Sequence, residues 1–105
     1  MAEAKRPTSI KVGPHTYKVF YKKSMDPYNE WSGLSAHDDL EIWIHAVEHI
    51  SAQRETLVHE VDHCIQHIFG AGLEAPTGEQ QAHARGMGWY TVMRENPKLI
   101  AWLLS

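Results

Sequence analysis

The segment from Ser51 to Phe69 constrains the fold most, because it has the pattern of one long amphipathic helix with a clear beginning and end. Its apolar residues follow the helical repeat and form a single stripe: Leu57, Val61, Cys64, Ile65 and Ile68. Ser51 is a suitable N-cap, and Gly70 with Gly72 ends the helix. The sequence therefore predicts a helix whose apolar stripe is covered by a core.

Two histidines, His59 and His63, lie four residues apart on this helix, with Glu60 between them. At about 3.6 residues per turn, positions i and i+4 share one face, so both rings can bind one Zn²⁺ at roughly 2.0 to 2.1 Å. Glu60 points away from the metal and can act as a general base toward water. The pattern would arise by chance in about 5% of shuffled sequences, but a chance motif need not fall inside a capped amphipathic helix. We therefore predict a metal site.

The composition indicates one small domain. The chain has 105 residues, of which 43% are hydrophobic, and a single cysteine, Cys64, which excludes an internal disulfide framework. Cys64 lies on the apolar stripe and is expected to be buried rather than to bind metal. With neither a secretory signal nor a long apolar run, we expect a soluble, cytoplasmic protein without a membrane partner. The basic residues concentrate in the first 23 positions, where solvated strands explain them better than nucleic-acid binding.

Three strands are expected before the helix. Residues 8–12 and 15–21 alternate apolar and polar side chains around Gly13-Pro14, which predicts a β-hairpin. Residues 24–38 are rich in turn formers and are expected to make an irregular excursion. Residues 39–45 alternate again, so a third strand should run directly before the motif helix.

Two helices are expected after Gly72. The sequence Thr77-Gly-Glu-Gln80 matches a capping box that opens the first of them, and its mid-helix glycines, Gly86 and Gly88, suggest a close approach to the motif helix. The inward stripe is expected to comprise Glu79, Ala82, His83, Gly86, Tyr90 and Met93.

Asn96 and Pro97 have the pattern of an N-cap and first position of a short last helix. Its apolar run, residues 99–104, is expected to dock on the core, with a dimer contact as the alternative. Residues 1–7 are expected to be a disordered tail and residues 8–105 one domain. The fold class predicted is a small α+β domain, with a three-stranded antiparallel or mixed sheet packed on the helices.

A catalytic zinc usually has three protein ligands and one open position, so the histidine pair needs a further ligand. The linker from residue 70 to residue 77 is long enough for the next helix to return its first turn to the metal. Glu79 is the favoured third ligand, because a carboxylate on an otherwise apolar face is costly to bury without a cation. His83, one turn later, is the alternative ligand.

These motifs resemble those of small phage and prophage metallopeptidases related to the ImmA/IrrE family of zincins. In that family the zinc helix carries His-Glu-x-x-His, and a later helix carries a segment like E-x-x-A-N-x-F-A whose glutamate is the third ligand. This chain lines up with the segment at Glu79 and Ala82 and differs from it at three positions: His83, Arg85 and Gly86. The resemblance covers about residues 8–100. It implies a zincin-like fold, one Zn²⁺ per chain and a phage-encoded enzyme in the cytoplasm of a bacterial host.

The function predicted is therefore a gluzincin-like zinc metallopeptidase that hydrolyses peptide bonds in a protein or peptide substrate. Its metal ligands would be His59, His63 and Glu79, and its catalytic base would be Glu60. Three residues are candidates to stabilise the oxyanion: His83, Tyr90 and His45. The strand that contains Trp43 is expected to be a sheet edge that pairs with an extended substrate. The same ligand set also accepts Mn²⁺, Co²⁺ or Ni²⁺.

Two other hypotheses remain open at the level of sequence. One is a zinc-bound module that captures another protein without proteolysis, and the other is a structural domain with chance histidines. Glu60 argues against the former, because a metal site kept only for stability needs no base. A Glu60→Gln variant separates an enzyme from a binding module, and the zinc content of the purified protein tests the latter.

Overall fold

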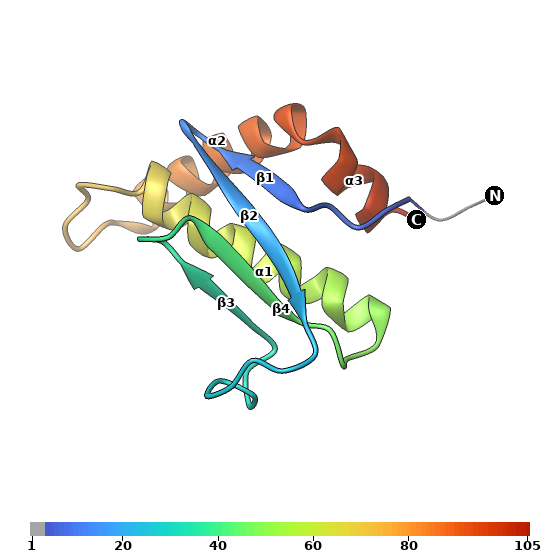
Figure 1. The fold of residues 1–105 in the computed structure, drawn as a ribbon. Helices are drawn as coiled ribbons and strands as arrows, with labels where there is room; N and C mark the ends of the chain where they lie inside the picture. Colours follow the sequence, from blue (N-terminus) through green and yellow to red (C-terminus); the bar gives the residue numbers. More distant parts are fainter. Residues whose placement is uncertain (1–3) are drawn as a thin grey trace.

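The computed structural model describes residues 4–105, which form a four-stranded sheet and three helices (Figure 1). The elements, in chain order, are β1 (Ser9–Val12), β2 (His15–Lys22), β3 (Gly33–Ala36), β4 (Glu41–His45), α1 (Ile50–Phe69), α2 (Gly78–Glu95) and α3 (Pro97–Leu103). The α+β class with a mixed sheet is confirmed, and the predicted number of three strands is wrong. Within residues 4–105, no helix combines the length and the apolar character that a membrane span requires.

The strand order in the sheet is β1-β2-β4-β3. β1 and β2 form the predicted antiparallel hairpin, in which Ile10 lies opposite Tyr17. β4 runs parallel to β2 and antiparallel to β3, so it is flanked on both sides. The prediction that the strand containing Trp43 is an edge is therefore wrong, because Trp43 pairs with Phe20 on one side and with Leu34 on the other. β3 is the edge strand on this side.

β3 lies inside the segment for which the sequence predicted only an irregular excursion. Its four residues, Gly-Leu-Ser-Ala, include no β-branched side chain and show no clear alternation of burial. Strand formation there depends on backbone pairing with β4, in which Leu34 lies opposite Trp43. A local pattern could not reveal this pairing, because it is set by the partner strand.

α1 packs its apolar stripe against one face of the sheet and passes behind it in the view of Figure 1. Leu57, Val61, Cys64 and Ile65 are buried, and Ile68 is partly buried, as the stripe predicts. The prediction of Ser51 as the N-cap is wrong, because the helix begins at Ile50 and its N-cap is His49. The His49 ring accepts a hydrogen bond from the Ser51 N–H at 3.1 Å. Gly70 is the C-cap, as predicted.

α2 begins with the predicted capping box, in which Thr77 Oγ1 accepts from the Gln80 N–H and the Gln80 side chain accepts from the Thr77 N–H. Its predicted inward stripe is wrong: every one of its six residues is exposed, among them Tyr90 at 60%. The buried residues are instead Ala84, Gly88 and Val92. At Gly88 an added Cβ would lie 2.3 Å from Ile65 Cγ2, so the two helices approach where the side chain is smallest.

α3 packs Leu99 and Trp102 into the core, as the expected docking helix. Asn96 precedes it but does not cap it through its side chain. The buried amide instead accepts from the Lys11 N–H and donates to the Lys11 and Val92 carbonyls, all at 2.8 Å. The Asn96 side chain thereby links the end of α2 to β1.

Of the predicted tail, residues 1–3 lie outside the described part, and the Pro7 carbonyl accepts a hydrogen bond from Tyr21 Oη.

Candidate metal centre

The two motif histidines converge on one point beside α1. Their Nε2 atoms lie 3.0 Å apart, and the two rings meet edge to face with centroids 4.6 Å apart. Two nitrogens bound to one tetrahedral Zn²⁺ would lie about 3.3 Å apart, which follows from bond lengths of roughly 2.0 to 2.1 Å. The His59 side chain is 66% exposed, so a cation from solvent can reach the pair. The donor atoms present, two imidazole nitrogens on one helix face, thus fit a divalent transition metal.

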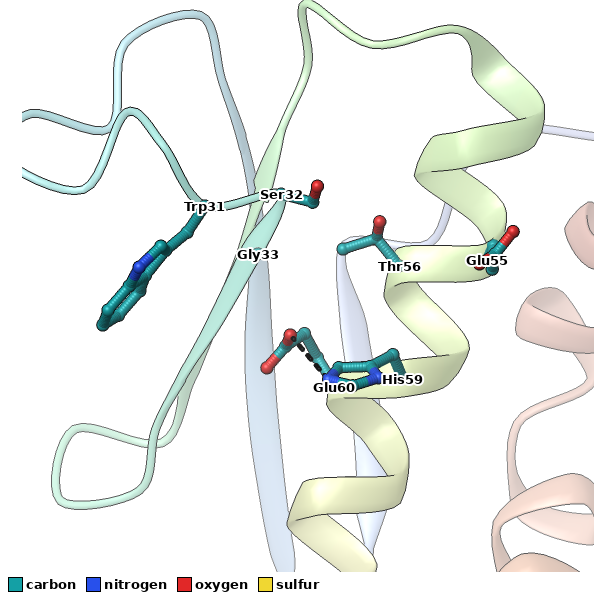
Figure 2. Close-up of a pocket in the computed structure, with 7 residues that line it drawn as sticks. All are labelled: Trp31, Ser32, Gly33, Glu55, Thr56, His59 and Glu60. Atoms are coloured by element: carbon teal, nitrogen blue, oxygen red, sulfur yellow. Dashed lines mark ion pairs between the residues drawn. The ribbon is translucent and has the colours of Figure 1, made fainter.

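Glu60 is held beside this pair by β3. Glu60 is only 6% exposed, and its Oε1 accepts a hydrogen bond of 2.8 Å from Ser35 Oγ. The other carboxylate oxygen, Oε2, lies 4.0 Å from His59 Nε2 (Figure 2). This close arrangement requires Gly33, because a Cβ there would lie 2.6 Å from Thr56 Cγ2 and 3.1 Å from Glu60 Oε2. One oxygen of the carboxylate is therefore anchored, while the other faces the histidines.

Two hollows, of about 360 and 350 Å³, open at this place between β3 and α1. The first, drawn in Figure 2, is lined by Trp31, Ser32 and Gly33 on the strand side and by Glu55, Thr56, His59 and Glu60 on the helix side. The second shares four of these residues and adds Leu34, Ser35, His37 and His63. Neither hollow is lined by a lysine or an arginine, so a cation meets no repelling charge among the lining residues.

Glu79 and His83, the two predicted candidates for the third ligand, line a different hollow with Phe69, Leu73 and Met87. Among residues 4–105, no three side chains of metal-binding type converge, so neither residue is brought to the histidine pair. The reason is the face on which α2 packs: Ala84 and Gly88 turn toward α1, and the exposed Glu79 and His83 do not. Glu79 as a ligand stays a prediction that this arrangement does not support.

The residues predicted to stabilise an oxyanion or to line the substrate edge also lie elsewhere. Tyr90 Oη accepts from Arg94 on the exposed side of α2. Trp43 lies under the Lys22 ammonium, 3.3 Å from its ring centroid, and donates to Glu41 Oε1. His45, His83 and Tyr90 are all absent from the residues that line the two hollows beside His59.

Sequence reasoning did not identify His37 as part of the site. Its Nδ1 lies 3.0 Å from Tyr17 Oη, and its ring stacks on that of His67 with centroids 4.1 Å apart and planes 4° from parallel. Burial lowers the pKa of His37, and the neighbouring His67 and His63 lower it further, against the opposing effect of Asp38. The sequence holds no local signal for His37, because this residue reaches the site through the pairing of β3 with β4.

Asp62, which follows Val61 on α1, links this helix to α2 through hydrogen bonds. This carboxylate accepts hydrogen bonds from Arg85 Nη2 at 2.8 Å, Trp89 Nε1 at 3.0 Å and Gln66 Nε2 at 2.7 Å. Burial alone would raise the pKa of Asp62, but these donors outweigh it and hold the pKa below its ordinary value of 3.8.

Burial raises the pKa of the Cys64 thiol to about 11, which fits the predicted role of a buried apolar residue.

Comparisons with protein-family models, with curated proteins and with solved structures gave no match to this chain.

Proposed function

We propose that this chain is a metal-dependent peptidase in which His59 and His63 bind the metal and Glu60 is the general base. The observation that supports the proposal is the convergence of the two Nε2 atoms, 3.0 Å apart, beside an anchored carboxylate. A metal site that served stability alone would not need a nearly buried carboxylate with one oxygen free to face it. A divalent cation bound there supplies Lewis-acid chemistry, because it polarises a peptide carbonyl.

The carboxylate of Glu60 is oriented for proton transfer. Ser35 Oγ donates to Oε1, which leaves Oε2, the oxygen nearer to His59, to accept a proton from a water molecule in the hollow. The same residue can return the proton to the leaving amine, since the hollow is shared by the base and both histidines. Ser35 thus acts as a positioning residue for this base.

The proposed substrate is an extended segment of a protein or peptide that pairs with β3. β3 is the edge of the sheet and borders the hollows through Gly33, Leu34 and Ser35. An edge strand presents unpaired backbone N–H and C=O groups that an added strand can bind. A peptide bound in this way would pass next to Glu60 and the histidines. β3 therefore replaces the strand containing Trp43 as the proposed substrate strand.

The test is hydrolysis of a mixed peptide library by the zinc-loaded protein, with new termini detected by mass spectrometry. We expect cleavage by the wild type, which chelation abolishes and added Zn²⁺ restores. Glu60→Gln should bind zinc with unchanged stoichiometry and reduce cleavage about 100-fold or more, since general-base catalysis typically contributes 10²- to 10⁴-fold. Glu74→Gln, which removes an exposed carboxylate in the α1–α2 loop, is the matched control and should cleave like the wild type.

If Glu60→Gln cleaves as fast as the wild type, the role of Glu60 is wrong. If zinc binds but no peptide in the library is cleaved, the protein is a zinc-bound interaction module instead of a peptidase.

A further inference from the structure

The proposed metal site lacks one ligand. Open catalytic zinc sites usually have three protein ligands, and within the described residues only His59 and His63 converge. The following inference rests on the proposed function, since it concerns the same metal.

Among residues 4–105, His37 is the only further side chain of metal-binding type that lines the hollow shared by both motif histidines. Apart from His59, Glu60 and His63, the residues around that hollow are Trp31, Gly33, Leu34, Ser35 and His37. Of these five, only His37 carries an imidazole, a carboxylate or a thiol, the groups that bind transition metals. It lies two residues after Ser35, directly beyond the end of β3, so the strand that holds Glu60 also holds His37 at the site.

The contacts of His37 resemble those of a histidine ligand. Metal-bound histidines almost always donate the other ring N–H to a fixed acceptor, which sets the tautomer and the ring orientation. In the tautomer with its proton on Nδ1, His37 donates to Tyr17 Oη at 3.0 Å and leaves the Nε2 lone pair for a metal. Tyr17 is fully buried in the core, so this partner is rigid.

We propose that His37 is the third protein ligand, which gives a three-histidine site for a divalent transition metal with His59 and His63. As described, the three imidazoles do not converge, so metal binding requires the His37 ring to swing toward the pair while its Nδ1 keeps the hydrogen bond to Tyr17 Oη. The ring then leaves its stack on His67. This assignment replaces Glu79, which lines a separate hollow.

Titration of the metal-free protein with Co²⁺, followed by visible absorption, tests the assignment without any assay of hydrolysis. We expect His37→Ala to weaken Co²⁺ binding about 100-fold or more and to change the d–d bands, and Tyr17→Phe to weaken it by about 10-fold. Two matched controls should bind Co²⁺ within about threefold of the wild type: His67→Ala, which removes the stacked ring, and Glu79→Ala, which removes the competing candidate.

A second variant keeps the test valid if His37→Ala is poorly folded. His37→Cys places a thiolate at the same position, and a bound Co²⁺ should then show a sulfur-to-metal charge-transfer band in the near ultraviolet that the wild type lacks. Absence of this band in a folded, Co²⁺-binding variant would overturn the assignment.

The outcomes separate this inference from the proposed function. If Glu79→Ala abolishes Co²⁺ binding while His37→Ala does not, His37 is not the ligand and the metal site stands. If His59→Ala binds Co²⁺ as tightly as the wild type, the metal site itself is wrong.

Discussion

Gly33 determines how closely β3 can approach α1 at the position of Glu60. A side chain at this residue would meet the Thr56 methyl group and the Glu60 carboxylate, both within about 3 Å of its Cβ. Two residues further, Ser35 supplies the hydrogen bond that orients the carboxylate. The position of the Glu60 carboxylate is thus set by two small residues of a four-residue strand.

A Gly33→Ala substitution should destabilise the protein by about 1 to 3 kcal/mol, because it overpacks the contact between β3 and α1. Urea denaturation measures this free energy of unfolding. Adding Thr56→Ser removes the methyl group that the new Cβ meets at 2.6 Å, so the double variant should recover part of the loss. An unchanged midpoint for Gly33→Ala would show that β3 does not lie this close to the helix.

The motif residues of the candidate site could be predicted, but the residues that support them could not. His59, Glu60 and His63 share one helix, so their relative directions follow from helical geometry alone. Gly33, Ser35 and His37 come to the site through the pairing of β3 with β4, a contact between distant parts of the chain that no local pattern encodes. The direction of Glu79 depends on how α2 packs against α1, so its place in the structure could not be predicted from a local pattern either.

At the scale of elements, the contact between α1 and α2 depends on the glycine at its centre. Gly88 lets α2 lie against Ile65 and Phe69, whereas Gly86, half a turn away, faces open space. Gly88→Ala should therefore destabilise the protein by about 1 to 3 kcal/mol through overpacking, and Gly86→Ala should stabilise it by up to about 1 kcal/mol through helix propensity. Thermal unfolding of the two variants under identical conditions measures both effects. If both substitutions stabilise the protein, or both destabilise it, α2 does not pack against α1 through the face that contains Gly88.

The link from Asp62 to α2 should make stability depend on pH. The donors on Arg85, Trp89 and Gln66 lower the folded-state pKa of Asp62 below 3.8, so its contribution is present at neutral pH and is lost as the pH falls through the folded-state pKa. Asp62→Asn should be less stable than the wild type at pH 7, and the difference should shrink as the pH falls below about 4. Chemical denaturation at a series of pH values tests this; a difference that is constant down to about pH 2 would show that the carboxylate gains nothing from these donors.

The elements with strong local signals were predicted well. The hairpin of β1 and β2, the capping box of α2 and the glycine end of α1 all depend on residues close in sequence. β3 was not predicted and the inward face of α2 was predicted wrongly, because each is determined by packing. Ala84 and Gly88 have little apolar surface of their own, so a hydrophobic periodicity cannot identify the face on which they are buried.

In the whole molecule, the order of the strands places the candidate site. β4 lies between β2 and β3, so β3 is the edge strand on the side of the sheet where Glu60 lies. This arrangement leaves Glu60 between the edge strand and its own helix (Figure 2), and both histidines are exposed to solvent. The fold thus puts a hydrogen-bonded carboxylate, two neighbouring imidazoles and a strand edge at one place.

The proposed chemistry requires that His59 and His63 together bind a metal ion. Calorimetric titration of the metal-free protein with Zn²⁺, beside the His59→Ala and His63→Ala variants, measures this binding. We expect one Zn²⁺ per chain for the wild type and a loss of affinity of at least about 100-fold in each variant. If the wild type takes up no zinc, or if uptake is unchanged in both variants, the two histidines do not form a metal site.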